Sequence, residues 1–92
     1  MGSTTDLKFN ALRAQGFTGS ITDMTLQWLQ NSGAISFSVS TAWDQMLQMN
    51  GYETQRNDGW SDMLNDMGYV NGSLSDRAHQ FWAAGGVLPG GN

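Results

Sequence analysis

The chain of 92 residues contains no cysteine and only one proline, and just 13% of its residues carry a charge. Without cysteine the protein has neither a disulfide framework nor a thiolate metal site. The charged fraction is about half of the ~25% that is typical of globular domains, so Ser, Thr, Asn, Gln and Gly must supply much of the surface. A chain of this length is expected to fold as one small domain.

Basic residues are scarce and scattered. The net charge is −4, and the four basic residues stand far apart in the sequence: Lys8, Arg13, Arg56 and Arg77. A nucleic-acid-binding surface needs a basic patch, and so does a peripheral membrane segment. No apolar run approaches the ~20 residues of a membrane span, and no apolar segment of a signal peptide follows the N-terminal MGSTTD. We therefore expect neither nucleic acid nor a membrane as a partner.

Glycine, by contrast, is abundant and regularly spaced. Five glycines follow one another at intervals of 17 or 18 residues: Gly16, Gly33, Gly51, Gly68 and Gly85. A large apolar residue precedes each of them by four positions: Leu12, Leu29, Leu47, Leu64 and Phe81. About 17 residues suffice for one short helix and a turn, and glycine is preferred just after a helix because it adopts the left-handed conformation most easily. The sequence therefore predicts five helix-turn repeats, with all five of these apolar residues buried.

Apolar residues within the repeats have helical spacing. Ile21, Met24 and Trp28 recur at i, i+3 and i+7, which places them on one face of a helix. We predict an all-α fold of five short helices, antiparallel to their neighbours and joined by turns of about 4–7 residues. The expected helices span residues 6–15, 21–32, 40–50, 59–67 and 74–84. They form a helical repeat domain over 6–85, between an N-terminal tail of 1–5 and a Gly-rich C-terminal tail of 86–92.

Two of the turns share a longer pattern, GFTGSITDM at 16–24 and GYVNGSLSDR at 68–77. In each, a serine stands three residues before an aspartate, which is the spacing of a capping box. The serine accepts a hydrogen bond from a free backbone N–H, and the aspartate adds negative charge where the helix dipole favours it. Thr41 and Asp44 have the same spacing. We interpret the motif as a device that ends one helix and begins the next; a ligand site formed by these loops is the alternative.

Two segments depart from the repeat. AISFSVS, residues 34–40, alternates apolar residues with serine, which is a strand pattern. We expect an extended segment near 34–38, either as a linker that packs Ile35 and Phe37 on the core or as a free edge that pairs with another subunit. The tail GGVLPGGN has apolar residues with no helix to join. Because departures from a local rule are expected at functional positions, we predict five interface residues: Ile35, Phe37, Val87, Leu88 and Pro89. Met49 and Met67 are further candidates for adaptable contacts.

No pattern in the sequence indicates catalysis. His79 is the single histidine, and Asp76 could share its helix face, but no nucleophile accompanies them. The aspartates at 58, 62 and 66 follow one face of a helix, and we expect them to form a solvated face in preference to a cation site. We therefore predict no catalytic, cofactor-binding or metal-binding residue, and a protein that is not an enzyme.

The paired motifs resemble the Gly-Tyr-Thr-Gly-Ser-Leu-Asn-Asp-Met helical repeats of small structural proteins of tailed bacteriophages. The similarity covers about residues 9–86; the second copy departs from the pattern by the extra Asn71 and by Arg77 in place of Met, and the middle units keep the helix but lose the turn. The resemblance implies a virion structural protein made in the host cytoplasm, either a head decoration protein or a tail or neck accessory. It also implies multiple copies per particle, bound to capsid, neck or tail subunits. A cellular helical adaptor or peptide-binding module is the alternative function.

Overall fold

The computed structural model describes residues 3–89, and it confirms the predicted all-α domain of five short helices. Within these residues there is no β-strand. The helices are α1 (Thr4–Ala14), α2 (Ile21–Asn31), α3 (Val39–Met49), α4 (Arg56–Asp66) and α5 (Leu74–Ala83). Their bounds lie within three residues of the predicted ones, and the largest difference is the earlier start of α4.

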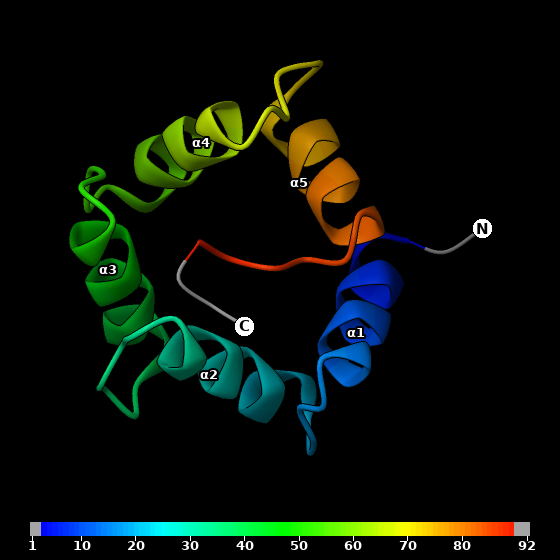
Figure 1. The fold of residues 1–92 in the computed structure, drawn as a ribbon, viewed down its shortest axis with the longest axis vertical. Helices are drawn as coiled ribbons and strands as arrows, with labels where there is room; N and C mark the ends of the chain where they lie inside the picture. The colour runs from blue at the N-terminus through cyan, green and yellow to red at the C-terminus, as the bar shows by residue number, and fades with distance from the viewer. Residues whose placement is uncertain (1–2, 90–92) are drawn as a thin grey trace.

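The five helices follow one another around a closed ring (Figure 1). Each helix packs against the helices before and after it, and α1 packs against α5 to close the ring. Two hydrogen bonds at this closure show the direction of the helices. Thr4, at the start of α1, bonds to His79 of α5 (Oγ1 to Nδ1, 2.9 Å). Gln15, just after α1, donates from Nε2 to the carbonyl oxygen of Gly85, just after α5 (3.0 Å). The two helices therefore run in the same sense.

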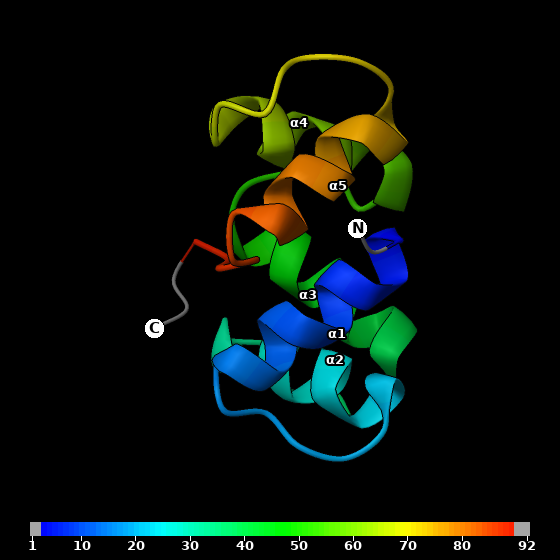
Figure 2. The same cartoon turned by 90° about the vertical axis from the view of Figure 1, so that its right-hand side faces the viewer.

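The shared direction corrects the prediction that neighbouring helices are antiparallel. Arg56 at the start of α4 donates to the carbonyl oxygen of Ser40 near the start of α3, and Figure 2 shows the α1–α2 connection returning from the end of α1 to the start of α2. Such a return is possible because a connection of six residues, 15–20, can span up to about 20 Å, whereas an 11-residue helix is about 16 Å long. We call the side where helices begin the N-terminal rim and the opposite side the C-terminal rim.

Every helix ends in the same hydrogen-bonded turn, which explains the glycine repeat. After α1, Gly16 N–H donates to Arg13 O (2.9 Å) and Phe17 N–H donates to Leu12 O (3.2 Å), which is the Schellman arrangement. The same pair of bonds recurs after the other four helices, and all five glycines have φ between 81° and 116°. The apolar residue whose carbonyl oxygen accepts from the residue after the glycine is at most 1% exposed in every repeat. The prediction that these five residues are buried is confirmed.

Both predicted capping boxes are present. Asp23 N–H donates to Ser20 Oγ and Ser20 N–H donates to Asp23 Oδ2, each at 3.1 Å, and Ser73 forms the same pair of bonds with Asp76. Gly19 must be glycine here, because a Cβ would lie 2.8 Å from Asp23 Oδ2. The interpretation of the motif as a device that links two helices is confirmed.

The third pair with capping-box spacing, Thr41 and Asp44, does not cap a helix. Thr41 and Asp44 lie inside α3, which begins at Val39 and has no side-chain cap, because the extended segment ends earlier than its alternating pattern indicates. A capping box that the sequence also offered was missed: Ser3 and Asp6 cap α1.

Replacing either capping serine should weaken the fold without changing it. We expect Ser20→Ala and Ser73→Ala each to lower the free energy of unfolding by about 0.5–2 kcal/mol, because a backbone N–H loses its acceptor. Urea unfolding followed by circular dichroism measures this loss. Thr41→Ala is the matched control, since Thr41 caps nothing, and it should change stability by no more than about 0.5 kcal/mol. Equal losses in all three variants would contradict the assignment.

Aromatic side chains form a circle inside the helical ring. Neighbouring ring centroids lie 4.8–5.4 Å apart around the circle, which consists of Trp28, Trp43, Trp60, Phe81 and Trp82. Four of these five contacts are edge-to-face, a geometry that aromatic quadrupoles favour, and the Trp28–Trp82 contact is tilted. The indole N–H of Trp28 needs an acceptor because this residue is 1% exposed, and it donates to Gly86 O at 2.8 Å.

The chain after α5 crosses the C-terminal rim and belongs to the core (Figure 1). Leu88 is 3% exposed and is part of the same hydrophobic cluster as the helices. The predicted domain boundary at residue 86 is therefore wrong for residues 86–89, and residues 90–92 lie outside the described part. At the other end, residues 3–5 belong to α1 and its cap, not to a tail, and residues 1–2 lie outside the described part.

Candidate functional site

The predicted interface residues of the α2–α3 connection are the most exposed large apolar residues described. Ile35 is 80% exposed and Phe37 is 88% exposed. Residues 34–36 have no regular secondary structure and residues 37–38 form a bend. The expectation that this segment packs the two side chains on the core is wrong. The two side chains point to solvent because the neighbouring Ala34 already occupies the buried position after α2.

The alternative of a free edge is disfavoured by the hydrogen bonds of this segment. The N–H groups of Ile35 and Ser36 both donate to Gln45 Oε1 at 3.0 Å, and Ser36 O accepts from Gln30 Nε2 at 3.1 Å. Strand pairing would have to replace these bonds. The segment thus offers its apolar side chains to a partner more readily than its backbone.

A third exposed apolar residue, Met49 at the end of α3, lies beside Ile35. The two flank a depression of ≈310 Å³ that is also lined by Gly33, Gln45 and Gln48. Met49 is 62% exposed, and none of the five lining residues is charged. We call Ile35, Phe37 and Met49 the apolar patch. A group of large exposed apolar side chains is typical of a protein-protein contact, whereas single ones are ordinary.

The predicted tail residues have different surroundings. Val87 is 46% exposed and remains available to a partner, and Pro89 is half-buried. Leu88 is buried within this chain, so its assignment to an interface is wrong: the C-terminal rim needs an apolar side chain to cover its aromatic core. Met67 packs partly on the core. The sequence reasoning missed Val70, which is 60% exposed; its signal was an apolar residue within a turn of Gly and Asn.

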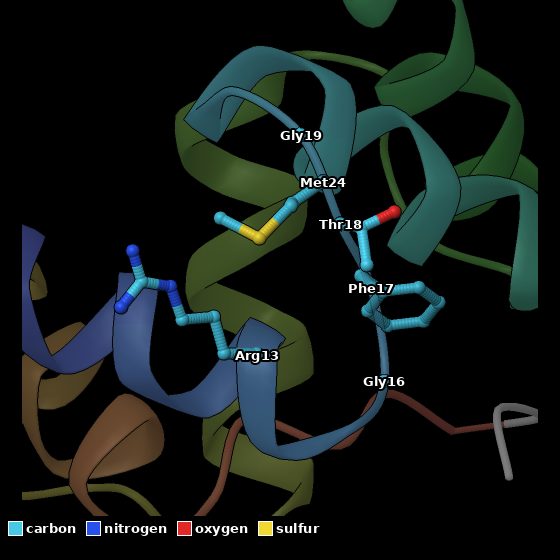
Figure 3. A pocket seen from close by; sticks show the side chains of 6 residues that line it. All are labelled: Arg13, Gly16, Phe17, Thr18, Gly19 and Met24. Carbon is cyan, nitrogen blue, oxygen red and sulfur yellow. The ribbon is translucent and has the colours of Figure 1, made fainter.

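The first repeated turn borders a pocket of ≈390 Å³ (Figure 3). Arg13 and Met24 lie on one side of the 16–19 loop and the Phe17 ring lies on the other. Arg13 stacks on the ring of Phe9, with 4.1 Å from its guanidinium carbon to the ring centroid. Within the loop, the N–H and the carbonyl oxygen of Thr18 already bond to the side chain of Gln27. Arg13 is the one charged residue among the six that line this pocket.

The polar residues considered for catalysis have structural partners. His79 shares its hydrogen bond with Thr4 across the α1–α5 contact, and Asp76 caps α5. Of the aspartates on α4, Asp66 accepts a hydrogen bond from Tyr52 Oη. Within residues 3–89 no group of three or more His, Asp or Glu side chains is arranged to hold a metal ion.

The N-terminal rim holds a half-buried lysine. Lys8 of α1 lines a cavity of ≈280 Å³ together with five residues of α2 and α3: Ile21, Thr22, Thr25, Val39 and Trp43. Its Nζ lies 5.6 Å from the centroid of a Trp82 ring. The ion pair found in residues 3–89 joins Arg56 to Asp44 and does not involve Lys8. Burial lowers the pKa of Lys8, because the charged form loses water without gaining a carboxylate. We call this site the Lys8 cavity.

The lowered pKa predicts how stability depends on pH. Below the folded-state pKa both states hold the proton, so the folded chain bears the full cost of burying the charge. Between that pKa and 10.5 the unfolded chain binds more protons, and the free energy of unfolding rises with pH. We expect Lys8→Met to be more stable than the native chain at neutral pH, and the difference to shrink as the pH approaches 10.5.

Urea unfolding of both chains over this pH range measures the effect. Tyr52 titrates in the same range, because its hydrogen bond to Asp66 raises its pKa, but it does so in both chains and cancels in the difference. A difference that stays constant with pH would contradict the assignment to Lys8.

Comparisons with known proteins leave the family open. No protein-family model matches the chain, and the searches of curated proteins and of solved structures give no significant match either. Among residues 3–89 no helix has the length and apolar character needed to cross a membrane.

Proposed function

We propose that the protein is a non-enzymatic structural component of a tailed-bacteriophage virion, a head decoration protein or a tail or neck accessory. The observation that carries the proposal is the apolar patch, in which Ile35 and Phe37 project from a connection that hydrogen-bonds to the side chains of two glutamines, Gln30 and Gln45. Met49 at the end of α3 adds a third exposed apolar side chain. A rigid, uncharged, apolar projection suits a lasting contact with another protein. The virion role itself comes from the resemblance of the two turn motifs to phage helical repeats.

The architecture supports a role as a small rigid module. Five helices, each ended by a Schellman turn, close into one ring around an aromatic circle. His79 bonds to Thr4 across the α1–α5 contact, and Asp76 caps α5. Low charge and abundant Asn, Gln and Ser fit a protein held among many neighbours. Capsid, neck or tail subunits are the partners we propose, with several copies per particle.

Mass spectrometry of purified particles tests the virion role. We expect the native protein at a fixed copy number per particle. The double variant Ile35→Ser, Phe37→Ser should fold as the native chain does, because both side chains are exposed, yet be lost from particles. Val70→Ser is the matched control, since it removes an exposed apolar side chain outside the patch, and it should be incorporated normally.

Two results would count against the proposal in different ways. Absence of the native chain from purified particles would remove the virion role and favour the cellular adaptor. Normal incorporation of the double variant would keep the virion role and exclude the apolar patch as the contact.

A further inference from the structure

Besides the apolar patch, the Lys8 cavity is a second surface feature, and its lysine has no evident role in stabilising the fold. Lys8 lies on the face of α1 that also presents Ala11 and Leu12 to the core. A lysine on such a face normally extends its ammonium to water or pairs it with a carboxylate. Here the ammonium stays half-buried against the Trp82 ring, and no carboxylate of residues 3–89 forms an ion pair with it.

The two rims of the ring differ in what covers them. The C-terminal rim is crossed by the segment after α5, whose Leu88 is buried in the hydrophobic core. The Lys8 cavity opens at the other rim, because Ile21 and Thr22 begin α2 and Val39 begins α3. The chain thus covers one face of its aromatic core and leaves a cavity with one cation at the other.

Apart from the cation, the walls of the cavity are largely apolar. Ile21, Val39 and Trp43 supply aliphatic and aromatic contacts, and the Thr22 hydroxyl adds a hydrogen-bond donor. The hydroxyl of Thr25 already donates to Ile21 O at 2.7 Å, so it is left as an acceptor. A volume of ≈280 Å³ is near the lower end of the ~300–1,000 Å³ of ligand pockets, which limits the ligand to a small molecule.

We infer that the Lys8 cavity binds a small organic carboxylate whose apolar body rests on Trp43 and Val39 while its carboxylate pairs with Lys8. The ammonium and the Thr22 hydroxyl both donate to the carboxylate oxygens, and charge-assisted bonds of this kind are the strong ones. A half-buried charge that has no carboxylate partner among residues 3–89 is expected where a ligand supplies the carboxylate. This inference does not depend on the virion role.

Titration of the full-length protein with three probes in carboxylate-free buffer tests the inference. Benzoate has both the charge and the apolar ring, benzyl alcohol has the ring alone, and acetate has the charge alone. Two-dimensional NMR should show saturable benzoate shifts at the amides of Ile21, Thr25 and Val39. Benzyl alcohol and acetate should bind at least about tenfold more weakly, because each lacks one of the two interactions.

Two variants separate the cation from the rest of the cavity. Lys8→Met keeps the length and apolar stem of the side chain, so the fold should persist, and benzoate affinity should fall about tenfold or more. Arg13→Met is the matched control, since it removes an exposed cation at another site, and it should bind benzoate as the native chain does. Unchanged benzoate binding by Lys8→Met, or no saturable shift in the native protein, would overturn the inference.

Discussion

Removal of residues 86–92 is expected to lower the free energy of unfolding by about 3–8 kcal/mol. Loss of a buried leucine side chain such as Leu88 costs about 2–5 kcal/mol. The indole N–H of Trp28 would also lose Gly86 O as its acceptor while it stays buried, which adds about 1–3 kcal/mol. A domain of this size has a total stability of roughly 5–14 kcal/mol, so the truncation should remove a large part of the free energy of unfolding.

Thermal and urea unfolding followed by circular dichroism and tryptophan fluorescence measure this loss. The matched control is a chain that ends at Pro89, because it keeps every contact described for the segment and should unfold at nearly the native midpoint. Leu88→Ala in the full-length chain isolates the leucine. A chain truncated before Gly86 that unfolded cooperatively at the native midpoint would show that the segment is not part of the core.

The expectation of a free tail failed for a physical reason. Sequence patterns predict that an apolar residue is buried when it recurs with helical or strand periodicity. Leu88 belongs to no such periodic pattern, because it lies in a short segment between Gly86 and Pro89. Its burial depends on the ring, whose C-terminal rim exposes aromatic rings that a short apolar segment can cover. Leu88 therefore departs from the repeat because it completes the hydrophobic core, whereas Ile35 and Phe37 depart from the repeat and are exposed to solvent.

Local rules in the sequence were sufficient for the helices. The spacing between each apolar residue and its glycine encodes a Schellman turn, so the number of helices, their ends and five of the core positions followed from the pattern. The serine and aspartate spacing also predicted two true caps. The same rule failed at Thr41, because a spacing cannot show where the preceding extended segment ends.

The ring and the candidate sites depend on contacts between distant residues. Closure rests on Thr4 with His79 and on Gln15 with the chain after α5, contacts that span at least 70 positions of the sequence. The side chain of Gln45, ten positions after Ile35, binds the backbone of the segment that carries the exposed Ile35 and Phe37. The Lys8 cavity needs three helices to meet, and a lone lysine in an N-terminal segment gave no sign of it.

Gly59→Ala is expected to destabilise the protein although it replaces glycine within a helix. In an exposed helix interior this change gains about 1 kcal/mol, because alanine has the higher helix propensity. Gly59 of α4 is buried, however, and a Cβ there would lie 2.0 Å from the carbonyl oxygen of Glu53 and 3.0 Å from Leu47 Cδ1. The backbone before α4 would have to move away. Overpacking of this kind costs about 1–3 kcal/mol and more where backbone resists, so we expect a net loss.

Asn57→Ala provides the matched comparison, because Asn57 is exposed two residues earlier in the same helix. It should leave the free energy of unfolding within about 0.5 kcal/mol of the native value. Amide chemical shifts should distinguish the two variants as well: Gly59→Ala should perturb Glu53 and its neighbours in the α3–α4 connection, and Asn57→Ala should not. A Gly59→Ala protein as stable as the native chain, with Glu53 unperturbed, would contradict this prediction. It would mean that α4 leaves room for a Cβ beside the carbonyl oxygen of Glu53.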